Sequence, residues 1–303
     1  RDSFQFHTKP IKRLGVPAIR MSDGPQGVGH RIETNAYPCG LALAATWNEK
    51  LAYEYGQSLG RDCRARGIHI ILGPAVNIHR APMCGRNFEY MGEDPYLTAR
   101  TTVGYIKGVQ SQKVMATVKH FLANNSDYDR ARISNDIDER TAHEIYFPAF
   151  KAAVQEAEVG AVMTSYNLVN GIYTNENPWL LKDVLRKTWG FNGMVVSDWS
   201  AAQYSIPTCN AGMDLEMPGA EKNKPQEIAY YLRTGYVTMD TINERIRHIL
   251  RVIIGFGFLD AQQQDKNIPL DNPASVETAL KVANEAIVLL KNEKNILPVN
   301  PKK

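Results

Sequence analysis

The chain has 303 residues, of which 44% are hydrophobic and 22% are charged, and its formal net charge is +3. This length and composition suffice for one large core of roughly 250 residues plus a smaller remnant. The near-neutral charge and the scattered basic residues exclude the basic patch of a nucleic-acid-binding protein, and no apolar run reaches the roughly 18 residues of a membrane span.

Apolar segments that suit buried strands alternate along the chain with amphipathic segments that suit helices. The predicted strands are 17–21, 68–72, 114–120, 161–166, 194–197 and 213–216. The predicted helices are 49–66, 96–112, 141–158, 179–188, 226–233 and 239–255. Alternating β and α units predict an α/β fold with a parallel sheet and right-handed crossovers. A (β/α)8 TIM-type barrel, regular or irregular, best matches the length.

The pattern changes after Phe258. Residues 258–274 are polar, with three consecutive glutamines and two prolines, and they predict a linker that follows a barrel of residues 1–257. Residues 275–303 begin with a helical pattern, and the apolar run 287–290 then predicts a buried strand. Little chain follows that strand, so we expect it to open a second α/β domain that the chain does not contain.

The cysteines show neither a CxxC pair nor a metal-type spacing with histidine, which predicts free structural thiols and leaves one disulfide as the alternative. They are Cys39, Cys63, Cys84 and Cys209. The chain begins at Arg1 without an initiator Met or a signal peptide, so we expect any targeting segment to lie upstream or to have been removed. A periplasmic or secreted location is slightly favoured over a cytoplasmic one. The sequence leaves undecided whether the protein forms a homo-oligomer.

Polar and aromatic side chains follow every predicted strand, and in a barrel such strand ends meet on one rim. In chain order they are Ser22-Asp23-Gly24-Pro25, Asn77 with the segment Gly85-Arg86-Asn87-Phe88-Glu89, Lys119-His120, Ser165-Tyr166-Asn167, Asp198-Trp199, and Asp214 with Glu216. Charged groups that make paired hydrogen bonds, together with flat aromatic rings, suit a polyhydroxylated ligand. The strand ends therefore predict a sugar pocket.

The heptapeptide Gly193-Met194-Val195-Val196-Ser197-Asp198-Trp199 is the most specific of these signals. It combines a short apolar strand, a carboxylate at the strand exit and an aromatic residue. We interpret Asp198 as a nucleophile beside a Trp199 platform for the sugar ring. Taken alone, Asp198 could equally be a helix N-cap, and only the other strand ends favour the nucleophile.

Several short motifs occur in a fixed order along the chain: Arg20-Met21-Ser22-Asp23-Gly24-Pro25, Ala45-Thr46-Trp47-Asn48, Leu72-Gly73-Pro74, Gly85-Arg86-Asn87, Gly92-Glu93-Asp94-Pro95, Lys119-His120-Phe121, Val196-Ser197-Asp198-Trp199 and Val288-Leu289-Leu290-Lys291-Asn292. Each motif is weak alone, but the ordered set resembles the N-terminal barrel domain of the family 3 glycoside hydrolases, close to the β-glucosidases. The resemblance covers nearly the whole chain.

The resemblance implies a retaining β-glucosidase that hydrolyses terminal non-reducing β-D-glucosyl residues. Asp198 would attack the anomeric carbon and form a covalent glycosyl-enzyme, which water then hydrolyses with the help of an acid/base. Because a nucleophile must be ionised, we expect Lys119 and Arg86 to keep the pKa of Asp198 low. The acid/base resembles a Glu supplied by the second domain, which would follow Lys303.

The resemblance also implies a substrate-binding set that consists of Asp23, Arg86, Lys119, His120, Tyr166 and the Trp199 platform. Asp23 would accept from the 4- and 6-hydroxyls, while Lys119 and His120 would bind the 2- and 3-hydroxyl side. The sequence around Asp23 favours a glucoside over a xyloside. The segment after Lys119-His120-Phe121 lacks the Pro-Gly and the downstream His of the N-acetylglucosaminidase branch, which argues against that activity.

Other functions stay as alternatives. A β-xylosidase or another exo-β-glycosidase of the family, and a sugar-binding barrel that is inactive in isolation, use the same residues. An aldolase-like barrel would use Lys119 as a Schiff-base former, which needs a depressed lysine pKa. The seven histidines form no HxH or HExxH pattern, so we expect no metal and no cofactor.

The expected partners are a β-glucoside or oligosaccharide substrate and the C-terminal α/β domain of the same protein, with no nucleic acid and no membrane span. Four further polar residues are weaker candidates for the pocket. Asn87 and Glu89 are pocket candidates, whereas Asp214 and Glu216 are expected to support it from behind. Trp47 is interpreted as a packing residue.

Overall fold

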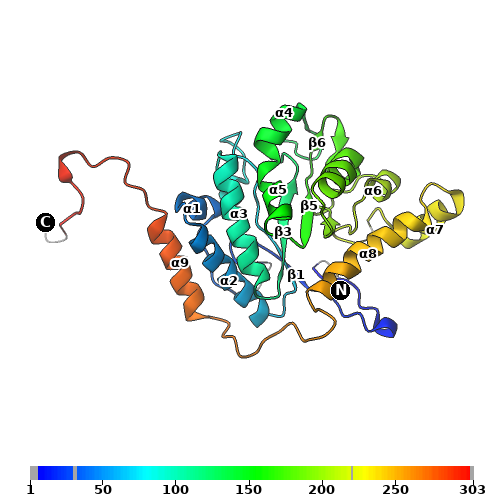
Figure 1. Ribbon diagram of the computed structural model, residues 1–303, viewed down its shortest axis with the longest axis horizontal. Coiled ribbons are helices and arrows are strands. Elements are labelled where there is room, and N and C mark those ends of the chain that lie inside the picture. The colour runs from blue at the N-terminus through cyan, green and yellow to red at the C-terminus, as the bar shows by residue number, and fades with distance from the viewer. Residues whose placement is uncertain (1–5, 30–32, 220, 301–303) are drawn as a thin grey trace.

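A computed structural model describes residues 6–29, 33–219 and 221–300, and a parallel sheet lies at its centre (Figure 1). The sheet has the order β1-β2-β3-β5-β8. Its strands are β1 (Met21–Asp23), β2 (Ile70–Leu72), β3 (Met115–Phe121), β5 (Ala161–Thr164) and β8 (Met194–Val196). Leu215 extends the sheet through a parallel bridge to Val196, where the sixth strand was predicted.

The N-terminal segment occupies the free edge of β1. His7 forms an antiparallel bridge with Arg20, and the amide of Met21 donates to the carbonyl oxygen of Phe6 at 2.8 Å. Among the described residues, no strand ladder joins β1 to the β8 end of the sheet. The predicted α/β barrel is therefore confirmed in an irregular, barrel-like form.

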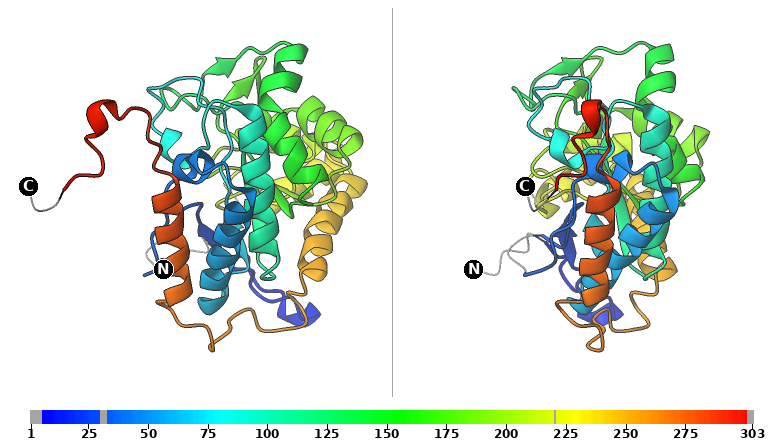
Figure 2. Two further views of the ribbon diagram at one scale, coloured as in Figure 1. Left: turned by 60° about the vertical axis from the view of Figure 1, so that its left-hand side comes forward. Right: turned by 90° about the vertical axis from the view of Figure 1, so that its left-hand side faces the viewer.

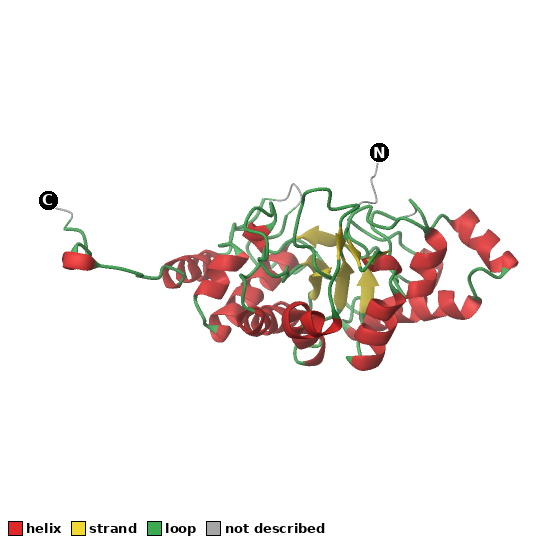
Figure 3. Cartoon of the chain, turned by 90° about the horizontal axis from the view of Figure 1, so that it is seen from above, coloured by secondary structure: helices red, strands yellow, loops and turns green. Residues whose placement is uncertain are grey.

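Helices lie on both sides of the sheet and along one of its faces, whereas loops lie along the other, as the view from above shows (Figure 3). The longer elements are α1 (Gly40–Ala45), α2 (Glu49–Ala65), α3 (Pro95–Gln110), α5 (Pro148–Gln155), a π-helix over Trp179–Thr188, α6 (Ser205–Ala211), α7 (Pro225–Thr234), α8 (Met239–Gly255) and α9 (Pro273–Glu285). The shorter ones are α4 (Glu139–Thr141), which continues into a π-helical turn over Ala142–Tyr146, and 3-10 turns at Lys12–Leu14, Asn87–Glu89, Thr174–Glu176 and Glu293–Asn295. No described helix is both long and apolar enough to cross a bilayer.

Local sequence explains where the helices begin and how closely they pack. Asp94 accepts from the amide of Leu97, and Pro95 then occupies the first turn of α3. Gly56 and Gly108 allow α2 and α3 to touch, because a Cβ on either residue would meet a carbonyl oxygen of the opposite helix. The predicted helix 141–158 is instead divided, because a new α-helix starts at Pro148 after the π-helical turn.

The strands contribute to two apolar layers because alternate side chains point to opposite faces. Ile71, Val118, Val162 and Val195 belong to the layer under the helices. The opposite faces of the same strands belong to a second layer inside the barrel, which contains Ile70, Leu72, Met115, Met163, Met194 and Val196. Each such buried side chain contributes about 1.5–3 kcal/mol. The four cysteines are free thiols, and three of them are buried.

A small three-stranded sheet lies among the loops that follow β3 and β5. It has the order β4-β6-β7, with β4 (Ser134–Asn135), β6 (Leu168–Val169) and β7 (Ile172–Tyr173). β6 and β7 form an antiparallel hairpin, and β4 pairs with β6 in parallel. Because β3 and β5 are parallel, this sheet lies at the carboxyl end of the barrel strands.

The predicted linker runs along the outside of the barrel between α8 and α9 (Figure 2). The Nε2 of Gln263 donates to the carbonyl oxygens of Ile68 and Lys113, at 2.9 and 3.1 Å. Residues 287–290 form no strand in this structure, and Leu290 is 91% exposed. The second domain that this apolar run was expected to open stays a prediction.

Helix α9 packs antiparallel on α2 and is bound to it by four side-chain pairs. The pairs are Asp62–Ser275 at 2.9 Å, Ser58–Thr278 at 3.0 Å, Glu54–Lys281 at 2.7 Å and Asn48–Glu285 at 2.6 Å. Helix α2 begins after the carboxyl end of β1 and returns to the start of β2. Since α9 runs the opposite way, it ends on the same side as the carboxyl ends of the strands.

Candidate active site

A cavity of about 380 Å³ lies at the carboxyl ends of the barrel strands. Six predicted site residues line it: Asp23, Arg86, Lys119, Tyr166, Asp198 and Trp199. Five further residues complete the wall, namely Phe6, Leu72, Arg130, Met163 and Met217. The structure therefore brings the predicted strand ends together, whereas the role of each residue stays a prediction.

Asp198 lies two residues beyond the end of β8 and is only 7% exposed. Its Oδ1 accepts a hydrogen bond from the backbone amide of Trp199 at 2.7 Å. Its Oδ2 lies 3.5 Å from Nη1 of Arg86 and 3.5 Å from Nε2 of His120. The amide of Trp199 and the guanidinium of Arg86 hold the carboxylate in one orientation at the cavity wall.

Burial raises the pKa of the Asp198 carboxyl above its ordinary value, because a desolvated charge is costly. Arg86 and Lys119 oppose this effect, as do the amide of Trp199 and the hydroxyl of Tyr166. We expected the two cations to keep this pKa low. They do act in that direction, but burial is the larger effect, so the expectation of a lowered pKa is not met.

Glu89 contacts both cations of the pocket, Arg86 and Lys119. Its Oε1 pairs with Nε of Arg86 at 2.5 Å, and its Oε2 lies 3.7 Å from Nζ of Lys119. Glu89 is only 4% exposed and does not line the cavity. We infer that it positions the cations, because each buried charge here has a partner of opposite sign.

His120 lies behind Arg86, with no exposed surface. Nη2 of Arg86 lies 2.7 Å from Nε2 of His120, and a guanidinium can only donate, so Nε2 accepts and the ring proton sits on Nδ1. Nδ1 is 3.3 Å from Oη of Tyr90 and 3.4 Å from Oδ1 of Asn77. Burial lowers the pKa of His120 well below its ordinary value, with Arg86 adding to the effect, so the ring is neutral.

Tyr166 and Arg130 also line the cavity and contact each other. The guanidinium carbon of Arg130 lies 4.2 Å from the centre of the Tyr166 ring, and Arg130 also pairs with Asp127 at 3.2 Å. Burial, followed by the charge of Asp198, raises the pKa of Tyr166, so its hydroxyl stays protonated and can donate to the Asp198 carboxylate. Sequence reasoning missed Arg130 because it lies in a loop rather than at a strand end.

An aromatic pair covers the apolar part of the cavity. The rings of Phe6 and Trp199 stack with their centres 4.6 Å apart and an interplanar angle of 21°. Both rings pack against the layer inside the barrel. The sequence indicated Trp199 as a platform but gave no signal for Phe6, which reaches the cavity only through the antiparallel pairing of the N-terminal segment with β1.

The remaining candidates lie outside the cavity. Asp214 is bound by Arg186 at 2.7 Å and by His248 at 2.9 Å, and Glu216 accepts from backbone amides of the loop that follows it. Asn87 donates to the carbonyl oxygen of Ala81 at 2.9 Å and so shapes its own loop. Trp47 was interpreted as a packing residue, but it is 72% exposed, so that interpretation is wrong.

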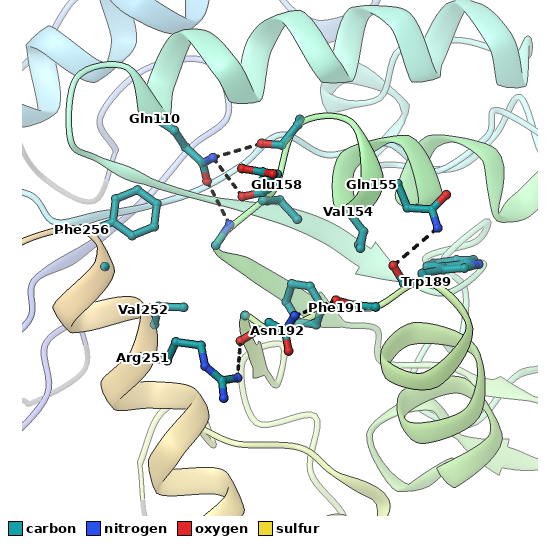
Figure 4. A pocket seen from close by; sticks show the side chains of 16 residues that line it. Gln110, Val154, Gln155, Glu158, Trp189, Phe191, Asn192, Arg251, Val252 and Phe256 are labelled. Carbon is teal, nitrogen blue, oxygen red and sulfur yellow. Dashed lines mark hydrogen bonds between the residues drawn. The ribbon is translucent and has the colours of Figure 1, made fainter.

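A larger hollow of about 750 Å³ opens at the other end of the strands (Figure 4). It contains Gly160 and Gly193, which directly precede β5 and β8. Its glutamine and arginine side chains are bound to backbone groups, such as Gln110 to the amide of Gly160 at 2.9 Å and Arg251 to the carbonyl oxygen of Asn192 at 3.1 Å. Barrel enzymes build their active sites at the carboxyl ends of the strands, so this hollow is the weaker candidate.

Comparisons with known proteins identify the family of this chain. The family model described as "Glycosyl hydrolase family 3 N terminal domain" matches residues 3–252. A "Beta-glucosidase" from Rhizobium radiobacter is 44% identical over 299 residues, which are 96% of this chain and 36% of that protein. A "Thermostable beta-glucosidase B" from Acetivibrio thermocellus is 40% identical over 97% of this chain and 40% of that protein.

Solved structures of the same kind superimpose closely. β-Glucosidase 3B from Thermotoga neapolitana, in complex with glycerol, gives a TM-score of 0.90 at 38% identity and covers 97% of this chain and 43% of its own. A β-glucosidase from Bifidobacterium adolescentis gives 0.92 at 37% identity, with the same coverage. The chain thus spans about two-fifths of the length of the proteins that it matches.

Proposed function

Because this chain belongs to glycoside hydrolase family 3, we propose that it carries the nucleophile and the glucose-binding wall of a retaining β-glucosidase. The observation that carries the proposal is the buried Asp198 carboxylate, which the amide of Trp199 and the guanidinium of Arg86 hold beside a stacked aromatic pair. The names of the relatives support the glucoside substrate.

In this mechanism Asp198 attacks the anomeric carbon, the bond to the aglycone oxygen breaks as the glycosyl ester forms, and the acid/base gives its proton to that oxygen. Water then attacks the same carbon, returns a proton to the acid/base, and releases glucose and the free carboxylate. Arg86 and Lys119 favour the ionised form of Asp198, which is needed for both the attack and the departure. The hydroxyl of Tyr166 orients the carboxylate.

The other lining residues bind the sugar. Trp199 offers an apolar ring face, and Asp23 and Lys119 offer a carboxylate and an ammonium for hydroxyls. Arg130, which also lines the cavity, joins this set. His120 acts through Arg86, because its Nε2 is already taken by the guanidinium.

The acid/base is proposed to come from outside this chain. The cavity has two lining carboxylates, Asp23 and Asp198, and we assign them to sugar binding and to nucleophilic attack. The relatives are more than twice as long as this chain, which supports a second domain that supplies the acid. Helix α9 leads the chain toward the cavity side, which fits this arrangement.

The direct test is covalent labelling with an activated 2-deoxy-2-fluoro-β-D-glucoside, followed by peptide mass spectrometry. We expect the adduct on the peptide that contains Asp198, no adduct in Asp198→Asn, and full labelling in the surface control Asp183→Asn. A label on Asp23 or Glu216 instead would refute the assignment.

A second assay separates the enzyme from a sugar-binding barrel. An aryl β-glucoside has a leaving group that needs little protonation, so the chain should turn it over slowly without an added acid. Binding of glucose with no turnover of this substrate and no covalent label would favour the sugar-binding function. The ratio of activities on aryl glucoside and aryl xyloside, with and without Asp23→Ala, distinguishes the glucosidase from the xylosidase.

A further inference from the structure

Asp198 is the first residue of a tight four-residue turn. The amide of Ala201 donates to the carbonyl oxygen of Asp198 at 3.1 Å and closes this turn. Trp199 and Ser200 are its two central residues, and Ser200 has a φ of 58°. This is the left-handed region, which costs a residue with a Cβ more than it costs glycine. The chain therefore adopts an unfavourable conformation one residue beyond the Trp199 amide that orients the carboxylate.

Contacts from two other segments hold this turn in its shape. The carbonyl oxygen of Met217 accepts from the amide of Ser200 at 2.8 Å. Nδ2 of Asn175 donates to the carbonyl oxygen of Ala201 at 3.0 Å, and because a carbonyl can only accept, this bond fixes the orientation of the Asn175 amide. Gln203 donates to the same oxygen at 3.2 Å, but it belongs to the same loop as the turn. Strained backbone persists only where its surroundings hold it, so these contacts maintain the turn.

Asn175 lies in a short segment that is fixed to another part of the cavity wall. The 3-10 turn Thr174–Glu176 follows β7, and neither Thr174 nor Asn175 has exposed surface. Oγ1 of Thr174 accepts from the amide of Ser165 at 3.0 Å and donates to its carbonyl oxygen at 2.8 Å. Ser165 directly precedes Tyr166, which lines the cavity. Asn175 therefore connects the segment that carries Tyr166 to the turn after β8.

The next residue of the same 3-10 turn binds the loop farther along. Oε1 of Glu176 accepts from the backbone amide of Tyr204 at 2.8 Å and from that of Gln203 at 3.3 Å. Two consecutive side chains thus hold the loop after Trp199 at successive points. Of these two side chains, Asn175 makes the contact nearer to the carboxylate.

We propose that Asn175 is a positioning residue for the reaction at Asp198. It does not line the cavity, so it acts through the turn. By holding Ala201, it keeps Ser200 in the left-handed conformation and the Trp199 amide directed at the carboxylate. Without this contact the turn relaxes toward a negative φ, and the amide moves away from Oδ1. The inference rests on the proposed function, because only there is Asp198 the nucleophile.

The test compares two buried asparagines that lie two residues apart. Asn175→Ala should lower kcat/KM for an aryl β-glucoside by about 10- to 100-fold, because displacing a reacting group by about 1 Å costs that much. Asn177→Ala is the matched control. Oδ1 of Asn177 accepts from the amide of Leu180 at 3.2 Å, at the start of the π-helix and away from the cavity. The control should lower the thermal stability but leave kcat/KM near the wild-type value.

Changes at Ser200 separate positioning from a general loss of structure. Glycine adopts a positive φ without strain, so the turn should keep its shape without help from Asn175. We expect the loss caused by Asn175→Ala to be several-fold smaller in a Ser200→Gly background. Ser200→Val places a β-branched side chain at this exposed position and disfavours the same φ, so it should impair kcat/KM with Asn175 in place. This variant tests the turn even if Asn175→Ala does not fold.

The pH profile provides a second readout. The amide of Trp199 lowers the pKa of Asp198, so the loss of this bond in Asn175→Ala should move the acidic limb of kcat/KM to higher pH. The control Asn177→Ala should leave the limb in place. The other polar groups that face the carboxylate keep their identity in every variant, and they are Arg86, Lys119, His120 and Tyr166.

Hydrogen exchange separates this proposal from the proposed function, because it needs no activity. Exchange over residues 198–204 should accelerate in Asn175→Ala and stay unchanged in Asn177→Ala. Equal exchange or equal kinetic losses for the two variants, or a loss that Ser200→Gly does not reduce, would overturn the positioning role. If Asp198 is not the nucleophile, the covalent label falls elsewhere while the exchange result still holds.

Discussion

Nη2 of Arg86 donates to Nε2 of His120 at 2.7 Å, and Nη1 of the same guanidinium reaches Oδ2 of Asp198 at 3.5 Å. A neutral, buried histidine therefore fixes the cation that faces the carboxylate. A protonated His120 would have no lone pair at Nε2 and would place a second charge against Arg86. Burial is the main cause of the depressed pKa of His120, and the charge of Arg86 adds to it, so the ring stays neutral and can accept from the guanidinium.

Arg86→Gln removes a charge that lowers the pKa of Asp198. That pKa then rises further, so the acidic limb of the pH profile of kcat/KM should move to higher pH. We expect kcat/KM to fall by about 10²–10³-fold, as when one preorganised donor is lost. The measurement is the pH dependence of aryl glucoside hydrolysis. Arg100→Gln, which breaks a pair with Glu156 away from the cavity, is the control and should leave the limb in place.

Tyr166→Phe removes the hydroxyl that stabilises the Asp198 carboxylate but keeps the ring under Arg130. We expect a smaller shift of the acidic limb in the same direction and a loss of kcat/KM of about tenfold, since one hydrogen bond to a charged group is lost. Tyr166→Leu also loses the ring contact with Arg130 and should be the more impaired variant. Equal kinetics for the two variants would show that the hydroxyl alone matters.

His69 makes the fold sensitive to acid. Burial, followed by the charge of Arg20, lowers its pKa to about 4. Between pH 6.5 and 4 the unfolded chain binds a proton that the folded chain does not, so the free energy of unfolding falls as the pH falls through that window. One such group contributes at most about 1.4 kcal/mol per pH unit.

Urea unfolding at several pH values tests this. His69→Asn keeps an acceptor for the backbone amide of Arg20, which now donates to Nδ1 of His69 at 3.1 Å, and removes the titrating ring. We expect a shallower loss of the free energy of unfolding below pH 6.5. An unchanged slope would assign the acid sensitivity to other groups.

Asp62 anchors α9 on α2. The carboxylate has no exposed surface and accepts from the hydroxyls of Tyr37 and Ser275, at 2.7 and 2.9 Å. Asp62→Ala leaves these donors buried and unpaired, so we expect a loss of about 3 kcal/mol in the free energy of unfolding. Hydrogen exchange over residues 273–285 should accelerate with it.

The matched control is Glu54→Ala, at the exposed pair of the same two helices. Water screens that pair, so the control should change the free energy of unfolding far less. Equal effects of the two substitutions would show that the buried carboxylate has no special role in binding α9.

Much of this architecture was predictable from the sequence. The apolar runs that became β3, β5 and β8 are short, continuous and followed by polar residues, so both the strand type and the pocket side followed from local pattern. Arg130 and Phe6 were not predictable, because each reaches the cavity through a long-range contact: a stack on Tyr166 and an antiparallel pairing with β1.

The electrostatics of the site also could not be predicted from the sequence. Lys119 and Arg86 indicated a low pKa for Asp198, but the balance depends on how completely the carboxylate is desolvated, which the residue types do not reveal. His120 likewise indicated a sugar contact, whereas it is buried behind Arg86 and has no surface in the cavity. Burial, rather than residue type, therefore determines both the pKa of Asp198 and the contacts of His120.

Because α9 packs antiparallel on α2, the chain that continues from α9 starts at a fixed place on the barrel. Asn48 binds Glu285 at 2.6 Å, so residue 286 starts its path beside the first turn of α2, on the side where Asp198 opens to solvent. A group carried by a chain that continues from there stays tethered to the barrel, so its effective concentration at the cavity depends on the length of that tether. For the proposed second domain, α9 would therefore turn an encounter between two separate domains into the closure of a short tether.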